Sequence, residues 1–227
     1  SLANTLDGGA GNDTLDGGAG DDVLLGGAGD DFAWGGFGAD SIVGGDGVDT
    51  LSFLFAVQSV SVDLSAGRGA LNQAAGDTYS GIEVVVDGTT GDTLIGSGAH
   101  ETLDGYDGAD LLVGGGGNDS LFGGIGDDTL TGGEGDDTLN VWDGADRALG
   151  GAGNDLIIGG AGPQYLDGGD GVDTVDLSRA GPLNVWFSGA VGDHTVVGAE
   201  WVVGSAQGDT LYDDVGTDQV LIGGGGG

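Results

Sequence analysis

The chain has 227 residues, of which 57 are glycine, and it carries 38 acidic residues against 3 basic ones, so its formal net charge is −35. This charge excludes a nucleic-acid binder that neutralises phosphates, and it disfavours docking on anionic membranes. No apolar run approaches the roughly 18 residues of a membrane span. Cysteine is absent, which excludes disulfides and thiolate metal sites. The acids are 34 aspartates and only 4 glutamates, a bias typical of turns and of oxygen-ligand metal sites.

A nine-residue repeat begins near the start of the chain. From Gly8 the sequence reads GGAGNDTLD, GGAGDDVLL, GGAGDDFAW, GGFGADSIV and GGDGVDTLS without a gap. The sixth position of these units holds Asp13, Asp22, Asp31, Asp40 and Asp49. Such a fixed register predicts a repeat architecture rather than disorder.

A second, longer array has the same nine-residue spacing. Steps of nine from Glu83 reach Asp92, Glu101, Asp110, Asp119, Asp128, Asp137, Asp146, Asp155, Gln164 and Asp173. A third, short run holds Glu200, Asp209 and Asp218.

The residue two places after each of these positions is always apolar. Because side chains alternate across a strand, a short strand such as Thr14-Leu15-Asp16 points its leucine inward and its neighbours outward. The glycines before it supply a sharp turn and allow positive φ. Two units then form one flattened coil of eighteen residues. Stacked coils predict two parallel sheets whose leucines meet between them.

The pattern Gly-Gly-x-Gly-x-Asp-x-apolar-x resembles the calcium-binding nonapeptide of RTX (repeats-in-toxin) proteins. The units that match best are residues 8–52 and 105–140. The resemblance implies an all-β fold, a parallel β-roll (β-solenoid) with calcium ions between glycine-rich turns. It also implies that ions lie in a row along each edge of the roll.

The residue types suit calcium independently of the family. Calcium takes six to eight oxygen ligands, and a glycine turn can aim several carbonyls at one point while aspartate adds a carboxylate. Units eighteen residues apart are neighbours on one edge, so Asp13 is expected to share an ion with Asp31, and Asp119 with Asp137. We expect about ten ions, with the following aspartates as candidate ligands: Asp13, Asp22, Asp31, Asp40, Asp49, Asp92, Asp110, Asp119, Asp128, Asp137, Asp155, Asp173 and Asp209. The candidate carbonyl donors lie in the turns, at positions such as Gly8, Gly9, Gly17, Gly18, Gly26, Gly27, Gly114, Gly115, Gly123, Gly124, Gly132 and Gly133.

Some units depart from the pattern, and we expect weak or absent sites there. Glu101 follows a degenerate turn, Val141 and Trp142 replace two glycines, and Pro163 precedes Gln164. Another departure concerns packing, because Ala33 fills a leucine position between Phe32 and Trp34. Apolar bulk is therefore expected on the outer face of that strand.

Two inserts interrupt the nine-residue repeat and divide the chain. We expect a first RTX array at 1–52, a β insert at 53–90, a second array at 91–176, a β insert at 177–207, and terminal RTX-like rungs at 208–227. Both inserts contain an alternating strand, and both reach a Gly-x-Glu-x-Val-Val segment that holds Glu83 or Glu200. The inserts are expected to continue the coil as calcium-free rungs, with these glutamates as turn or hydrogen-bonding residues.

The sequence favours a non-catalytic structural module and predicts no catalytic residues and no organic cofactor. His100 and His194 have no sequence partners for catalysis or for zinc, and no HExxH or GxSxG motif is present. The resemblance implies a secreted or cell-surface protein of a Gram-negative bacterium, of the adhesin, matrix, S-layer or filament type, exported by type I secretion. The alternatives are an accessory domain of a secreted protease, lipase, epimerase or toxin, and a carbohydrate-binding surface.

Calcium is the expected partner, and no nucleic acid and no membrane span are expected. Two other partners stay open. Copies of the chain, or the rest of a longer solenoid, fit the apolar strands at both ends, and a surface polysaccharide fits the four tryptophans.

Overall fold

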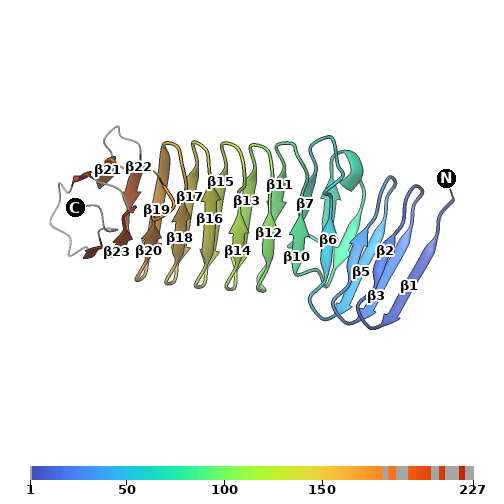
Figure 1. Ribbon diagram of the computed structural model, residues 1–227. Helices are drawn as coiled ribbons and strands as arrows, with labels where there is room; N and C mark the ends of the chain where they lie inside the picture. Colours follow the sequence, from blue (N-terminus) through green and yellow to red (C-terminus); the bar gives the residue numbers. More distant parts are fainter. Residues whose placement is uncertain (1, 181–183, 188–193, 206–209, 213–219, 223–227) are drawn as a thin grey trace.

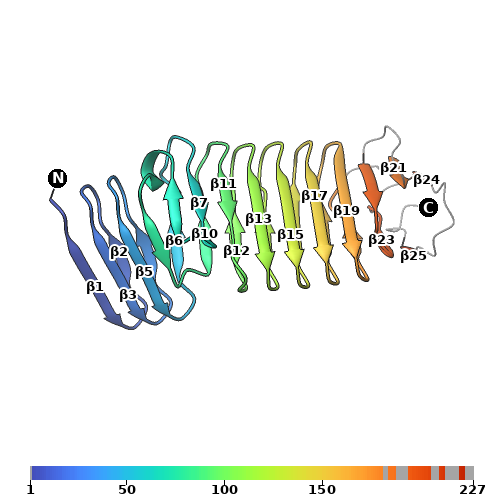
Figure 2. The ribbon, with the colours of Figure 1, turned by 180° about the vertical axis from the view of Figure 1, so that it is seen from behind.

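The computed structural model describes residues 2–180, 184–187, 194–205, 210–212 and 220–222. In this part of the chain, short strands coil around one thin core and form two facing sheets (Figures 1 and 2). Residues 5–10 lie at one end of the elongated coil, and residues 201–203 lie toward the other end. The predicted all-β, parallel β-solenoid is confirmed.

The first sheet has 14 strands, and most of the strands outside the inserts are six residues long. They continue into the glycine turns, so they are longer than the three-residue strands expected from the sequence. In spatial order they are β1 (Thr5–Ala10), β3 (Val23–Ala28), β5 (Ser41–Asp46), β9 (Thr78–Ser80), β8 (Arg68–Ala70), β7 (Ser61–Asp63), β11 (Thr93–Ile95), β13 (Leu111–Gly116), β15 (Thr129–Glu134), β17 (Arg147–Ala152), β19 (Gln164–Asp170), β22 (His194–Val197), β21 (Asn184–Phe187) and β24 (Thr210–Tyr212).

The second sheet has 11 strands, mostly of three residues, and every pairing described in it is parallel. In order they are β2 (Thr14–Asp16), β4 (Phe32–Trp34), β6 (Thr50–Ser52), β10 (Val84–Val86), β12 (Thr102–Asp104), β14 (Ser120–Phe122), β16 (Thr138–Trp142), β18 (Leu156–Gly159), β20 (Thr174–Asp176), β23 (Trp201–Val203) and β25 (Val220–Ile222).

Neighbouring strands within the arrays pair eighteen residues apart, as the two-unit coil predicts. Leu112 is the register partner of Leu130, and Leu121 that of Leu139. The apolar stripe forms the core between the sheets. Its members with described side chains are at most 6% exposed, except Leu6, which is partly buried. The fully or nearly buried ones are Leu15, Leu24, Ala33, Ile42, Leu51, Val85, Leu94, Leu103, Leu112, Leu121, Leu130, Leu139, Ala148, Ile157, Leu166, Val175 and Val202.

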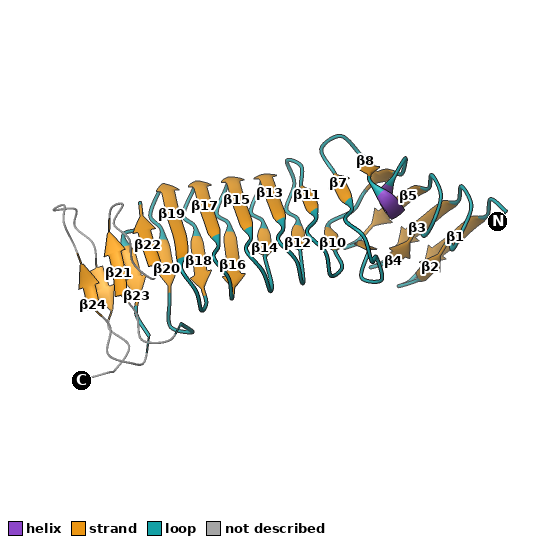
Figure 3. Cartoon of the chain, turned by 90° about the horizontal axis from the view of Figure 1, so that it is seen from above, coloured by secondary structure: helices purple, strands orange, loops and turns teal. Residues whose placement is uncertain are grey.

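The first insert continues the first sheet in an order that the sequence did not predict. β9 pairs with β5, and β7 pairs with β11, both in parallel. β8 lies between β7 and β9 and runs antiparallel to these two strands. A short 3₁₀ helix, η1 (Asn72–Ala74), follows β8 at the side of the coil (Figure 3). The insert therefore adds strands to the solenoid, and the chain reverses direction twice, before and after β8.

The second insert also changes the order of strands. β22 pairs with β19, and β21 pairs with β22 on its far side, so the earlier strand lies further along the coil. Asp209, a candidate ligand, lies outside the described residues. No helix in the described part of the chain is long and apolar enough to cross a membrane.

Candidate metal sites in the glycine turns

In most units, the second and fourth residues of the repeat adopt positive φ. In the unit that begins at Gly26, φ is 116° at Gly27 and 128° at Gly29. A residue with a Cβ is strained in this region, whereas glycine is not. Tyr106 (φ 68°) and Trp142 (φ 55°) occupy the second position in two later units without this freedom.

The repeat aspartates form ladders along the two edges of the coil. From Asp22 onward within the arrays, the Oδ1 atom accepts a hydrogen bond from the backbone N–H of the residue eighteen places earlier, whereas Asp92, which follows the first insert, accepts from Val60. Asp137 accepts from Asp119 at 2.8 Å, and Asp31 accepts from Asp13 at 2.8 Å. The pairs expected from the sequence to share an ion are therefore direct neighbours.

We call these ladders the first and second carboxylate rows. The first precedes the strands of the 14-stranded sheet and holds Asn4, Asp22, Asp40, Asp77, Asp92, Asp110, Asp128, Asp146 and Gln164. The second precedes the strands of the 11-stranded sheet and holds Asp13, Asp31, Asp49, Glu83, Glu101, Asp119, Asp137, Asp155, Asp173 and Glu200.

The other carboxylate oxygen of most row members is buried and has no hydrogen-bond partner. Burial of an unpaired anionic oxygen is costly, so each such atom marks a place for a cation or a proton. In the described part of the chain these atoms are Oδ2 of Asp13, Asp22, Asp31, Asp40, Asp49, Asp110, Asp119, Asp128, Asp137, Asp155 and Asp173, and Oε2 of Glu101, together with Oδ2 of Asp87, which lies outside the rows.

A space lined by oxygen atoms, which could hold an ion, lies beside the first glycine of most regular units. A Cβ placed on Gly8 would lie 2.7 Å from the carbonyl oxygen of Gly26 and 2.8 Å from Oδ2 of Asp13. A Cβ on Gly17 would meet the corresponding oxygens of Gly35 and Asp22 at 2.6 and 2.9 Å. Glycine is required here because a side chain would enter a space lined by oxygen atoms.

The electrostatics of the rows favour the neutralised form of the carboxyls. Burial, with a smaller contribution from the carboxylates of Asp128 and Asp92, raises the pKa of Asp110 to about 7. Burial likewise raises the pKa of Asp119, Asp137 and Asp155 to about 6. Like charges spaced by roughly one strand, about 4.8 Å, repel by of order 1 kcal/mol or more per pair.

This donor set fits calcium. Among the described residues, no three side chains of Asp, Glu, His or Cys gather around one point, so side chains alone do not complete a site, and the backbone carbonyls of the turns are the further donors that the chain offers. Calcium accepts such carbonyls with one or two carboxylates, whereas magnesium demands a tighter octahedron and retains water.

At Gln164, in the first row, a side-chain amide donates a hydrogen bond to the carboxylate oxygen that is unpartnered in most other row members. Nε2 of Gln164 donates to Oδ2 of Asp146 at 2.9 Å and to the carbonyl oxygen of Trp142 at 2.8 Å. Oδ2 of Asp146 is therefore satisfied, unlike the corresponding atom of Asp128. This geometry supports the expectation of a weak or absent site at Gln164.

The two insert glutamates lie in the rows as hydrogen-bond acceptors. Oε2 of Glu83 accepts from the N–H of Asp49 at 2.9 Å, and Oε2 of Glu200 accepts from Asp173 at 2.6 Å. At the degenerate turn, the hydroxyl of Ser97 donates to Oε1 of Glu101.

The sequence reading missed one member of the first row, Asp77. Its Oδ1 accepts from the N–H of Asp40 at 2.8 Å, and its Oδ2 accepts from the hydroxyl of Tyr79 at 3.0 Å. The local signal was the Asp-Thr-Tyr run at 77–79, which matches the Asp-Thr-Leu of the repeat but lies off the nine-residue step.

A second ladder, on the exposed turn tips, was also missed. The residue before the row aspartate accepts from the backbone eighteen residues later, as Asn12 does from Asp30 at 3.0 Å and Asn118 from Asp136 at 3.0 Å. This exposed ladder holds the turns in register without burying charge.

A parallel β-roll whose glycine turns form rows of oxygen-lined cradles is a calcium-binding repeat structure. The family model for the RTX calcium-binding nonapeptide repeat matches residues 1–33, 16–51, 77–112, 104–139, 113–148, 143–175 and 194–227. These segments cover well over half of the chain, which therefore belongs to the RTX calcium-binding nonapeptide repeat family. A comparison with curated proteins gave no match.

Proposed function

We propose that the chain is a non-catalytic, calcium-dependent structural module of a secreted or cell-surface bacterial protein. The observation that carries the proposal is the set of buried, unpartnered carboxylate oxygens in the two rows. A chain with a net charge of −35 cannot keep these atoms buried and ionised at neutral pH without cations. Calcium binding is then part of the folding free energy.

The proposed ligands are the row aspartates, with carbonyl oxygens of the first glycines. Asp13 and Asp119 are examples, each beside a glycine of its own unit and a carbonyl of the next coil. We expect the sites to bind calcium in the range of extracellular modules, about 10⁻⁴–10⁻³ M, which suits the space outside cells. Folding only after export follows from this affinity.

The role of the module is mechanical or organisational, as in adhesins, matrix proteins, S-layers and filaments. β1 and β2 are the terminal strands of the two sheets, and a terminal strand offers backbone groups for pairing. We propose that a further coil, from a second copy or from the rest of a longer solenoid, stacks on this rung when calcium is bound. Electron microscopy in millimolar calcium distinguishes filaments from short particles.

Far-UV circular dichroism during a calcium titration tests the proposed function. The expected result is a cooperative gain of β signal near the extracellular calcium range, with little gain in a matched magnesium titration. A full β signal in excess EGTA at neutral pH would contradict the proposal, because the rows would then be stable without a cation.

A further inference from the structure

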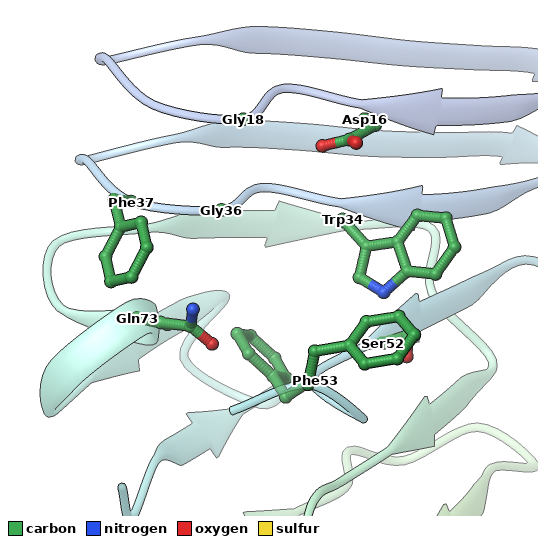
Figure 4. Close-up of a pocket in the computed structure, with 9 residues that line it drawn as sticks. Asp16, Gly18, Trp34, Gly36, Phe37, Ser52, Phe53 and Gln73 are labelled. Atoms are coloured by element: carbon green, nitrogen blue, oxygen red, sulfur yellow. The ribbon is translucent and has the colours of Figure 1, made fainter. Parts of the chain in front are cut away.

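The outer face of the 11-stranded sheet carries two grooves lined by aromatic side chains. The first aromatic groove has a volume of about 240 Å³ and is lined by Asp16, Trp34, Phe37, Phe53, Phe55 and Gln73, among others (Figure 4). The second aromatic groove has a volume of about 500 Å³, and its lining includes Asp104, Tyr106, Phe122, Ile125, Trp142 and Asp143.

The two grooves are built from the same positions of the coil. Asp16 and Trp34 are register partners on β2 and β4, and Asp104 and Phe122 are register partners on β12 and β14. Each groove thus places a carboxylate beside an aromatic ring. The strands β4 and β14 are four steps apart in the sheet, which corresponds to about 19 Å along the solenoid.

Large aromatic side chains in these grooves face solvent. Phe37 is 65% exposed and Phe55 is 71% exposed, and the rings of Trp34 and Phe55 lie 5.9 Å apart. In the second groove Tyr106 and Trp142 are about half exposed. Clustered exposed aromatic surface is typical of a binding site rather than of a free surface.

The first groove also contains a polar group without a partner. The indole Nε1 of Trp34 is buried and makes no hydrogen bond within the described chain. Figure 4 shows this nitrogen on the edge of the indole that is nearest Phe53, with Phe37 and Gln73 at the opposite end of the groove. An indole N–H can only donate, so a ligand that satisfies it must present an acceptor.

The second groove rests on two strained residues. Tyr106 and Trp142 adopt the positive φ that glycine takes in other units, and Gly124 separates them in the same line of turns. Residues held in this strained conformation cluster at ligand-binding and active sites. Glycine at either position would relieve the strain and would remove one wall of the groove.

We propose that the two aromatic grooves bind pyranose rings of one neutral polysaccharide chain. A pyranose offers an apolar C–H face to an aromatic ring and hydroxyls at its rim that both donate and accept. The rim hydroxyls can accept from Nε1 of Trp34 and donate to the carboxylates of Asp16 and Asp143. A cationic ligand would leave the indole donor unsatisfied, and the net charge of −35 repels anionic polymers. The common face and spacing of the grooves favour a polymer over a single sugar.

The test uses the full chain loaded with calcium and a panel of neutral polysaccharides that includes α-glucans, β-glucans, mannan and galactan. Isothermal titration calorimetry is expected to detect binding to at least one of them. Trp34→Ala should weaken this binding by about tenfold or more. Tyr106→Gly should weaken it similarly while keeping or raising the thermal midpoint, because it relieves left-handed strain.

Trp201→Ala is the matched control, because Trp201 is a partly exposed tryptophan of the same sheet outside both grooves. Its binding should equal that of the unsubstituted chain. Trp34→Phe keeps an aromatic face but removes the donor, so an intermediate loss is expected. The proposal is overturned if no neutral polysaccharide binds, if only an anionic uronate polymer binds, or if Trp201→Ala weakens binding as much as Trp34→Ala.

Discussion

The side-chain amide of Gln164 donates a 2.9 Å hydrogen bond to Oδ2 of Asp146, the atom that stays unpartnered in neighbouring members of the same row. An N–H donor thus takes the place that we assign to calcium elsewhere. We therefore expect the rung that holds Gln164 to be joined to its neighbour without an ion.

Gln164→Asp should create a calcium site and make this rung depend on calcium. We expect the variant to bind about one more ion per chain, measured by equilibrium dialysis, because Asp146 and the new carboxylate then both lack a donor. Gln164→Asn is the control, since it shortens the amide without adding charge. An unchanged ion count in the aspartate variant would show that this loop cannot hold calcium.

Charge in the rows should matter more than charge on the turn tips. Asp119→Asn keeps the oxygen that accepts from Glu101 but removes a buried negative charge, so calcium affinity at the adjoining sites should fall by about tenfold. Asp127→Asn removes an exposed charge and preserves the acceptor for Ala145, so it should change the calcium midpoint little. Calcium titrations followed by circular dichroism compare the two. Equal midpoints would mean that the buried row does not ligate calcium.

The first glycine of a unit should tolerate no side chain. A Cβ on Gly114 would lie 2.8 Å from the carbonyl oxygen of Gly132 and against the carboxylate of Asp119, so Gly114→Ala should cost about 1–3 kcal/mol of unfolding free energy. Gly98→Ala is the control, because nothing lies within 4 Å of its Cβ position. Urea unfolding in saturating calcium measures both, and a similar loss in the control would refute the steric explanation.

Mild acid should partly replace calcium. The folded-state pKa of Asp110 is about 7 and those of Asp137 and Asp155 are about 6, all raised by burial above an unfolded value near 4. A raised folded pKa stabilises the folded state at low pH, and this stability is lost as pH rises through about 6 to 7. The calcium-free chain should therefore gain β signal between pH 8 and pH 5.

Calcium affinity should fall as the pH is lowered from 8 to 5, because protons and calcium compete for the same carboxylate oxygens. Light scattering controls for aggregation at the lower pH. Loss of calcium-free β signal on acidification would contradict the proposed protonation of the rows.

The regular part of the fold could be predicted from the sequence because one rule repeats. Leu112, Leu121 and Leu130 lie at a constant step, and that step fixes the coil, the two sheets and the core. The neighbours of Ala33 were also predictable, since an alternating strand sends Phe32 and Trp34 outward once a small residue fills the core position.

The order and direction of the strands in the inserts could not be predicted from the sequence. The antiparallel strand β8 depends on long-range pairing with β7 and β9, and no local pattern encodes this direction. Asp77 enters the first row because the chain reverses around β8, so it lies off the nine-residue step.

The side-chain contacts within the candidate sites could not be predicted from the sequence either. Gln164 could be recognised as a departure from the pattern, but its bond to Asp146 depends on which atoms the coil brings together. The replacement of a glycine by Trp142 could be recognised in the sequence, but the place of Trp142 in a groove depends on the neighbouring turns.

Anomalous diffraction from crystals grown with calcium tests the central claim most directly, because it locates each ion against each carboxylate. The account predicts two rows of calcium peaks, beside Oδ2 of aspartates such as Asp31 and Asp119, and no peak between Asp146 and Gln164. A folded chain with no calcium peaks beside these atoms, or with a peak between Asp146 and Gln164, would contradict it.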